Sequence, residues 1–164
     1  MIDLHCHMLP AMCDGAQDLE TALAMAQMAV DDGIKMTACT PHIYPGLYEN
    51  TAAGIHEAAL QFQSDLDDAG IPLMVTTGAD IQMVPELVDR LTAEVMPTLH
   101  GSRYFLFEPP HHVAPIGFNR AVSAAVQAGY VPLITHPERL SWIEDKYDLF
   151  VEAAKDGAWI QLTA

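Results

Sequence analysis

The chain repeats one pattern, in which a short apolar run is followed by a polar stretch and then by a segment with helical periodicity. The apolar runs, which we expect to be strands, are residues 1–4, 35–39, 73–77, 103–107, 131–135 and 158–162. Most of the helical segments between them end at a glycine just before the next strand, as a left-handed helix cap requires. Strands that alternate with helices form parallel β/α units. The pattern therefore predicts an α/β fold, either a barrel or an open parallel sheet.

Right-handed crossovers place the carboxyl ends of all parallel strands on one face, where such folds keep their active sites. The residues that follow the first five predicted strands share one property, because each is a histidine or a carboxylate. They are His5 and His7, His42, Asp80, Glu108 and His136. We therefore expect one edge of the sheet to gather potential metal ligands.

The sharpest element of this set is His5-Cys6-His7. Alternate residues leaving a strand point the same way, so two imidazoles can hold one cation. Mixed imidazole and carboxylate ligands suit Mn, Fe or Zn better than Ca. The three cysteines, Cys6, Cys13 and Cys39, are not clustered, which argues against a thiolate metal site.

Several further residues have both a functional and a plain interpretation. Arg139 follows His136 closely and is suited to clamp a phosphate or carboxylate, or else to pair with an acidic residue at a helix start. Asp14 lies in a loop, where Asp commonly makes an ordinary turn. His111 and His112 follow Glu108 on the same face, so a substrate role and a plain loop role both stay open.

Composition narrows the possible partners. A chain of 164 residues with 51% hydrophobic and 18% charged residues predicts a single folded domain. The formal charge of −15 disfavours nucleic acid and anionic membranes as partners, and an anionic substrate would need local cations. We expect no membrane insertion, because no apolar stretch is long enough, and a reducing cytoplasmic location.

These motifs, in this order, resemble the polymerase and histidinol phosphatase superfamily, and within it the bacterial capsule-associated, manganese-dependent tyrosine phosphatases. The resemblance covers essentially the whole chain, residues 1–164. It is carried by residues 1–10, 14–16, 40–42, 78–81, 107–108 and 136–139.

The resemblance implies a distorted, TIM-like β/α barrel of seven strands, of which about six are present here. It further implies two or three metal ions, foremost Mn²⁺, with Fe, Zn, Co and Mg left open. The substrate would be phosphotyrosine on a partner tyrosine kinase that controls capsule or exopolysaccharide synthesis; oligomerisation stays open. By resemblance, the metal ligands are His5, His7, Asp14, His42, Asp80, Glu108 and His136, and Arg139 is the catalytic, phosphate-binding residue.

Two departures from the family pattern bear on this expectation. Asp80 stands where the family usually has Glu, so its carboxylate is one methylene shorter. Family members also continue past residue 164 to a strand with an Asp-x-His ligand pair and another arginine. We therefore expect the chain to lack a C-terminal segment of the barrel, unless strands of another subunit complete it.

Three other functions stay open at this stage. The chain could be a small-molecule phosphatase of the histidinol phosphate type. It could also be a metal-dependent amidohydrolase, although that class typically carries a lysine where this chain has Glu108. A third alternative is a catalytically degenerate metal-binding scaffold. If the chain is a phosphatase, the expected nucleophile is a metal-activated hydroxide, so no covalent cysteine intermediate is expected.

Overall fold

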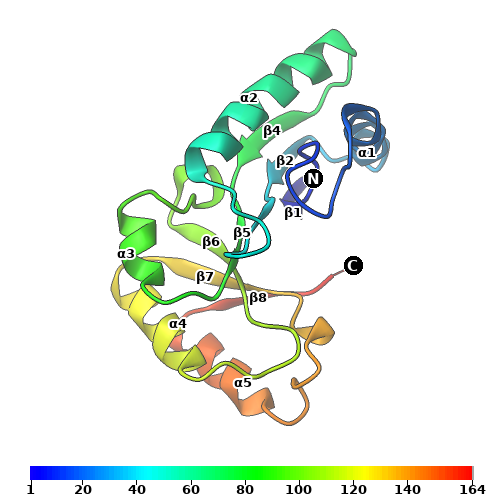
Figure 1. The fold of residues 1–164 in the computed structure, drawn as a ribbon. Helices are drawn as coiled ribbons and strands as arrows, with labels where there is room; N and C mark the ends of the chain where they lie inside the picture. The colour runs from blue at the N-terminus through cyan, green and yellow to red at the C-terminus, as the bar shows by residue number, and fades with distance from the viewer. Residues whose placement is uncertain (164) are drawn as a thin grey trace.

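The computed structural model describes residues 1–163 and shows two parallel sheets flanked by helices (Figure 1). The smaller sheet has the order β1-β2-β4, with β1 at Ile2–Cys6, β2 at Met36–Cys39 and β4 at Met74–Thr77. The larger has the order β3-β5-β6-β7-β8, with strands at His42–Ile43, Asp80–Gln82, Tyr104–Glu108, Val131–Thr135 and Trp159–Gln161. Every neighbouring pair in both sheets is parallel, as the repeated strand and helix pattern predicts.

The helices fill the intervals between strands. They are α1 at Leu19–Asp31, α2 at Ala52–Asp68, α3 at Leu87–Thr92, α4 at Phe118–Gln127 and α5 at Tyr147–Asp156, with short 3₁₀ turns η1 at Leu99–Gly101 and η2 at Pro137–Arg139. In Figure 1, α1 and α2 lie beside the smaller sheet, and α4 and α5 lie along β7 and β8 of the larger one. Each helix is thus the crossover of a β/α unit.

Apolar periodicity decides which face of each helix is buried. In α2 the buried residues are Ile55, Ala59, Phe62 and Leu66, spaced by three or four residues as one helix face requires. The expected glycine caps are confirmed, because Gly33, Gly70, Gly129 and Gly157 all have positive φ angles. Sequence periodicity therefore located these helices correctly.

Two strands differ from expectation. The run ending at Cys39 resumes as β3 after Thr40 and Pro41, and the run ending at Thr77 resumes as β5 after Gly78 and Ala79. Pro41 has no amide hydrogen to donate to a ladder, so it interrupts the strand. The backbone also comes close at Gly78, where an added Cβ would lie 2.7 Å from the Leu99 side chain.

The structure corrects the expected positions of four site residues. His42 begins β3 and Asp80 begins β5, whereas His5 and Glu108 lie inside β1 and β6 rather than in loops after them. A strand holds a side chain more firmly than a loop, because ladder hydrogen bonds fix its backbone. Four of the seven predicted ligands therefore lie on the sheets themselves.

The architecture is a mixed α/β fold with parallel sheets. Within residues 1–163, β8 pairs with β7 and no ladder joins β8 to β1, so the described chain does not form a closed barrel. None of the helices in this part of the chain is long and apolar enough to cross a membrane.

Candidate metal centre

An irregularity in β1 sets the positions of His5 and His7. The register of β1 against β2 shifts between Asp3 and Cys6, which is a β-bulge. The backbone amide of His5 donates to the Asp3 carboxylate at 3.0 Å inside this bulge. Both imidazoles then lie at the sheet edge, where their Nε2 atoms are 3.1 Å apart. One cation can be contacted by both rings.

Three strands of the larger sheet bring His42, Asp80 and Glu108 beside them. His42 pairs with Asp80 in the β3-β5 ladder, and β5 is in turn paired with β6, which ends at Glu108. Nδ1 of His42 lies 3.3 Å from Glu108 Oε2 and 3.7 Å from Asp80 Oδ2. The Asp80 carboxylate is fully buried, and its Oδ2 is also 3.3 Å from Nε2 of His5. Asp80 thus contacts ligands from both sheets despite its short side chain.

His136 enters the centre from a strained turn. It follows β7 with φ 31° and ψ 56°, a left-handed conformation that costs energy for a residue with a Cβ. Its Nε2 lies 3.6 Å from Asp80 Oδ2 and 4.0 Å from Glu108 Oε1. Such strain is typical of functional positions, where the surroundings impose an unusual backbone.

Asp14 reaches the centre because its loop folds back on β1. The amide of Ala16 donates to the His7 carbonyl at 3.0 Å. Oδ1 of Asp14 then lies 3.3 Å from Nδ1 of His7 and 3.5 Å from Nε2 of His42. Gly15 makes this approach sterically feasible, since an added Cβ would lie 1.9 Å from the His7 carbonyl oxygen. The seven predicted ligand residues are therefore all brought into one connected cluster.

The donor atoms of this cluster suit divalent cations. Several of them are buried and lack an aligned hydrogen bond within the described residues, namely both oxygens of Asp80, Nδ1 of His42, Nδ1 of His136 and Nε2 of His111. Buried polar atoms without partners are costly, so a bound cation would satisfy them. The cluster contains four overlapping groups whose ligand atoms lie within 4.8 Å of one another: His5, His7 and Asp80; His7, Cys13 and Asp14; His42, Asp80 and Glu108; and Glu108, His111 and His136.

The charge states of the cluster follow from burial and from its own neighbours. Burial raises the pKa of the Asp80 carboxyl, but His136 and His5 beside it lower the pKa by more, and the net direction is downward. For His5 and His42, burial lowers the pKa, whereas Asp80 and Glu108 respectively raise it by more. The pKa of His7 is lowered by burial and by the imidazoles of His42 and His5. A metal ion binds the neutral imidazole, so its binding would compete with protons at His5 and His42.

Three residues join the centre that the strand-end pattern did not select as ligands. Nε2 of His111 lies 3.0 Å from Glu108 Oε1, and its ring meets His136 edge-on at 5.5 Å. Gln161 of β8 contacts Nδ1 of His5 at 2.7 Å, which leaves Nε2 of His5 facing the centre. Cys13 Sγ lies 3.3 Å from Nδ1 of His7. In the sequence, His111 was marked by its place after Glu108 on the same face, whereas nothing local marked Gln161.

A cavity of about 550 Å³ opens onto the cluster, and Arg139 lies in its wall. The guanidinium of Arg139 is exposed and forms no ion pair with any residue between 1 and 163. The expected alternative, in which Arg139 pairs with Glu138 or Glu144, is therefore not observed. An unpaired cation beside a metal cluster is suited to an anionic ligand.

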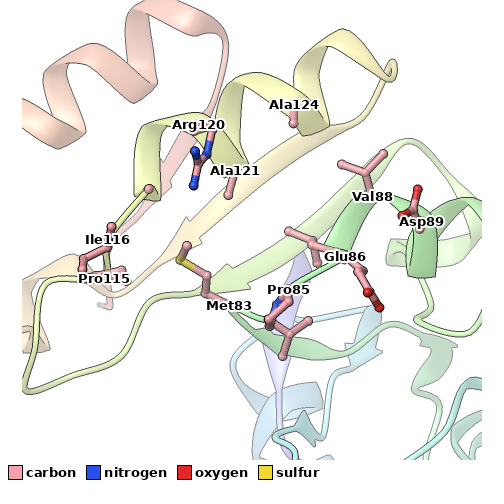
Figure 2. Close-up of a pocket in the computed structure, with 13 residues that line it drawn as sticks. Met83, Pro85, Glu86, Val88, Asp89, Pro115, Ile116, Arg120, Ala121 and Ala124 are labelled. Atoms are coloured by element: carbon pink, nitrogen blue, oxygen red, sulfur yellow. The ribbon is translucent and has the colours of Figure 1, made fainter.

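A different cavity of about 560 Å³ lies away from the cluster, between the start of α3 and the start of α4. Figure 2 shows Met83, Pro85 and Glu86 on one side of it, and Ile116 and Arg120 on the other. None of the seven predicted ligands lines this cavity. Six of the seven predicted ligands instead line the cavity that contains Arg139.

Comparison with known proteins places the chain in a family. Residues 1–164 match the model of the family described as "Capsular polysaccharide synthesis, CpsB/CapC". The chain belongs to the CpsB/CapC family. One similar protein is the tyrosine-protein phosphatase YwqE of Bacillus subtilis, which is 37% identical over 164 residues. The tyrosine-protein phosphatase CpsB of Streptococcus pneumoniae is 26% identical over the same length.

A solved structure agrees with this membership of the CpsB/CapC family. A crystal structure from work on YwqE of Bacillus subtilis and CpsB of Streptococcus pneumoniae, described there as unique metal-dependent tyrosine phosphatases, superposes with a TM-score of 0.94 and 36% identity. The superposition covers 99% of this chain and 66% of the other. This chain spans 65% of the length of YwqE and 68% of the length of CpsB.

Proposed function

We propose that this chain carries the centre of a metal-dependent phosphomonoesterase that acts on phosphotyrosine. The observation that supports the proposal most is the cluster of seven histidines and carboxylates. Several of its buried donor atoms lack an aligned hydrogen bond, and it lies beside the unpaired Arg139. The relatives YwqE and CpsB are named tyrosine-protein phosphatases, which supports phosphotyrosine hydrolysis as the reaction proposed for this cluster.

The residues that would hold metal ions are those of the overlapping groups. His5, His7 and Asp80 would form one position. His42, Asp80 and Glu108 would form a second, which shares Asp80 with the first, with His42 lying 3.7 Å from Asp80 and 3.3 Å from Glu108. The imidazole and carboxylate donor set favours Mn²⁺, with Fe, Zn, Co and Mg as the other ions to test. When bound, such ions polarise phosphoryl oxygens and lower the pKa of a water molecule.

The protein's own residues then orient the substrate. Arg139 would bind the phosphate oxygens, since a planar guanidinium donates two parallel hydrogen bonds to such a group. Gln161 fixes the ring of His5, so its Nε2 faces the centre. His111 holds Glu108 from the solvent side at 3.0 Å. The phenolate of tyrosine is a comparatively good leaving group, so a strong general acid is not required.

We also propose that the two sheets are parts of one distorted β/α barrel in a single domain. The support is continuity of the chain, because β2 runs into β3 and β4 runs into β5, so two segments belong to both sheets.

A tyrosine kinase of capsule or exopolysaccharide synthesis is the proposed partner, in line with the process named for the family. Its phosphotyrosine would be the physiological substrate, and the cytoplasm the location.

The test is phosphate release from a phosphotyrosine peptide, measured on protein stripped of metal and then reloaded with Mn²⁺. We expect activity only after reloading, and a fall in kcat/KM of about a hundredfold or more for His7→Ala. His56→Ala is the matched control, because His56 is an exposed histidine of α2 that lines neither of the cavities at the cluster. Histidinol phosphate serves as the small-molecule comparator.

Two results would overturn this proposal. Undiminished turnover by stripped protein would exclude the metal mechanism. Protein that binds Mn²⁺ yet hydrolyses neither the peptide nor histidinol phosphate would be the metal-binding scaffold instead.

A further inference from the structure

A second cavity of about 380 Å³ adjoins the metal cluster, and Arg139 is not among the residues that line it. It shares Asp14, His42, Glu108 and His111 as walls with the cavity that contains Arg139. Beyond these shared walls it is lined by Gln82, His112 and five mainly apolar residues. We call it the aromatic cavity and define it by Tyr44, Leu47, Tyr48, Pro110 and Val113.

The first wall of the aromatic cavity is the turn between Tyr44 and Tyr48, which hydrogen bonds hold in place. Tyr44 and Tyr48 exchange backbone hydrogen bonds, with the Tyr44 amide donating at 2.9 Å and the Tyr48 amide at 2.7 Å. The Asn50 amide group donates to the carbonyls of Met12 and His42, each at 2.8 Å. The turn is therefore fixed to the strand that carries a predicted metal ligand.

The ring of Tyr48 extends this wall to the metal cluster. It stacks on the His42 imidazole with centroids 5.5 Å apart and planes 13° from parallel. Leu47 beside it is 62% exposed, although it is a large apolar side chain. An aromatic face and an unburied leucine next to a catalytic cluster suit an apolar ligand group.

The opposite wall is pinned as well. Trp142 donates from Nε1 to the Pro110 carbonyl at 2.8 Å. Ser141 donates from its amide and from its hydroxyl to the His111 carbonyl, at 2.9 and 3.1 Å. Val113, at the mouth of this wall, is 69% exposed. Because both walls are held by hydrogen bonds to the rest of the fold, the cavity is preformed.

The two cavities differ in the chemistry they offer a phosphate ester. The one over the cluster has Arg139, Gln161 and Thr163 on its far side, which suits the phosphate itself. The aromatic cavity offers two tyrosine rings and two exposed aliphatic side chains, and its floor is formed by the cluster. An ester with its phosphate at the cluster would direct its organic group into one of these two openings, and only the second is mainly apolar among the described residues.

We propose that the aromatic cavity binds the aryl ring of the substrate and so makes the centre selective for aryl phosphate esters over alkyl ones. The inference rests on the proposed phosphatase function, because it takes the phosphate to lie at the cluster. The ring lies between the Tyr48 and Leu47 wall and the Val113 wall. Phosphotyrosine therefore binds better than phosphoserine because of a subsite, in addition to its better leaving group.

The test compares binding of two non-hydrolysable anions to Mn²⁺-loaded protein by isothermal titration calorimetry. Phenylphosphonate carries the ring and methylphosphonate does not, while the anionic group is the same. We expect phenylphosphonate to bind about tenfold more tightly. Leu47→Ser and Tyr48→Ala should each reduce that ratio to about twofold or less.

Leu60→Ser is the matched control, because Leu60 lies on α2 and is also 62% exposed. It should preserve the tenfold ratio. Equal binding of both anions by the unsubstituted protein overturns the aryl subsite but leaves the phosphatase function standing. A ratio that survives both Leu47→Ser and Tyr48→Ala overturns the assignment to this cavity. Failure of both anions to bind overturns the proposed function itself.

Discussion

Oδ2 of Asp80 lies 3.3 Å from Nε2 of His5, with the carboxyl fully buried between the two sheets. This contact joins β5 of the larger sheet to β1 of the smaller one. We predict that Asp80→Asn lowers the free energy of unfolding of the metal-free protein at pH 7 by about 3 kcal/mol, because it removes one partner of a buried ion pair. Urea unfolding followed by circular dichroism measures the change.

The sign of the pH dependence follows from the depressed pKa of Asp80. A carboxyl whose pKa is lower in the folded state stabilises the fold above its unfolded pKa, about 3.9, and that stabilisation is lost as pH falls through the folded pKa. The difference between the unsubstituted protein and Asp80→Asn should therefore shrink below about pH 4. An unchanged difference from pH 7 to pH 3 would show that the carboxylate charge does not contribute to stability.

The close approach of Gly15 to the His7 backbone gives a steric prediction. An added Cβ would lie 1.9 Å from the His7 carbonyl oxygen and 2.4 Å from its Cβ, so the loop must move. We expect Gly15→Ala to lower the unfolding free energy by about 3 kcal/mol and to weaken Mn²⁺ binding, since Asp14 moves with the loop. Gly54→Ala in α2 is the control, with a change within about 1 kcal/mol. Thermal melts and Mn²⁺ titration of both variants measure these changes. Equal stability and equal Mn²⁺ affinity of Gly15→Ala and Gly54→Ala would contradict the steric prediction.

The unpaired guanidinium of Arg139 predicts an effect on anion binding without an effect on metal binding. Arg139→Ala should weaken binding of inorganic phosphate to the Mn²⁺-loaded protein by about tenfold or more, because charge-assisted hydrogen bonds are lost. Metal content should stay unchanged, since Arg139 offers no ligand atom. Arg103→Ala, which removes an exposed arginine packed on Tyr104, should leave phosphate affinity as it is. Equal effects from the two variants would point to net charge rather than to a specific contact.

The cysteines should differ in reactivity. Burial raises the pKa of the Cys6 and Cys39 thiols to about 12 each. At pH 8 their thiolate fraction is about a thousandfold below that of an ordinary cysteine, so alkylation by iodoacetamide should be correspondingly slow. Burial also raises the pKa of the Cys13 thiol, but backbone hydrogen bonds from Gly15 and His42 partly offset this, so Cys13 should react first, as peptide mass spectrometry over time would show. Equal rates for all three thiols would contradict this order.

Most of the fold could be predicted from local sequence signals. Apolar periodicity and glycines at the ends of helical segments identified the helices, and apolar runs identified the strands. These signals depend on neighbours in the chain. The interruptions at Thr40 and at Gly78 could not be foreseen as strand breaks that resume. Pro41 marks the first break locally but does not show that a strand resumes after it. The break at Gly78 involves a distant residue, because an added Cβ there would meet the Leu99 side chain.

The predicted ligands lie close together because a parallel β/α topology places the carboxyl ends of its strands on one face. The repeated strand and helix pattern of the sequence was enough to predict this topology. Gln161 and Tyr48 were not identified, since their roles come from contacts made across the chain and not from residue type. Gln161 lies 156 positions from the histidine it contacts. Whether the gathered residues bind metal remains a prediction from their chemistry.

The most direct test of the metal centre is the number of Mn²⁺ ions bound per chain, measured by elemental analysis after equilibrium dialysis of the stripped protein. We predict about two to three ions per chain, falling by at least about one in Asp80→Asn, whose carboxylate is shared between positions. A folded protein that holds fewer than about one ion at saturating Mn²⁺, or whose count is the same in Asp80→Asn, would contradict a shared metal centre between the two sheets.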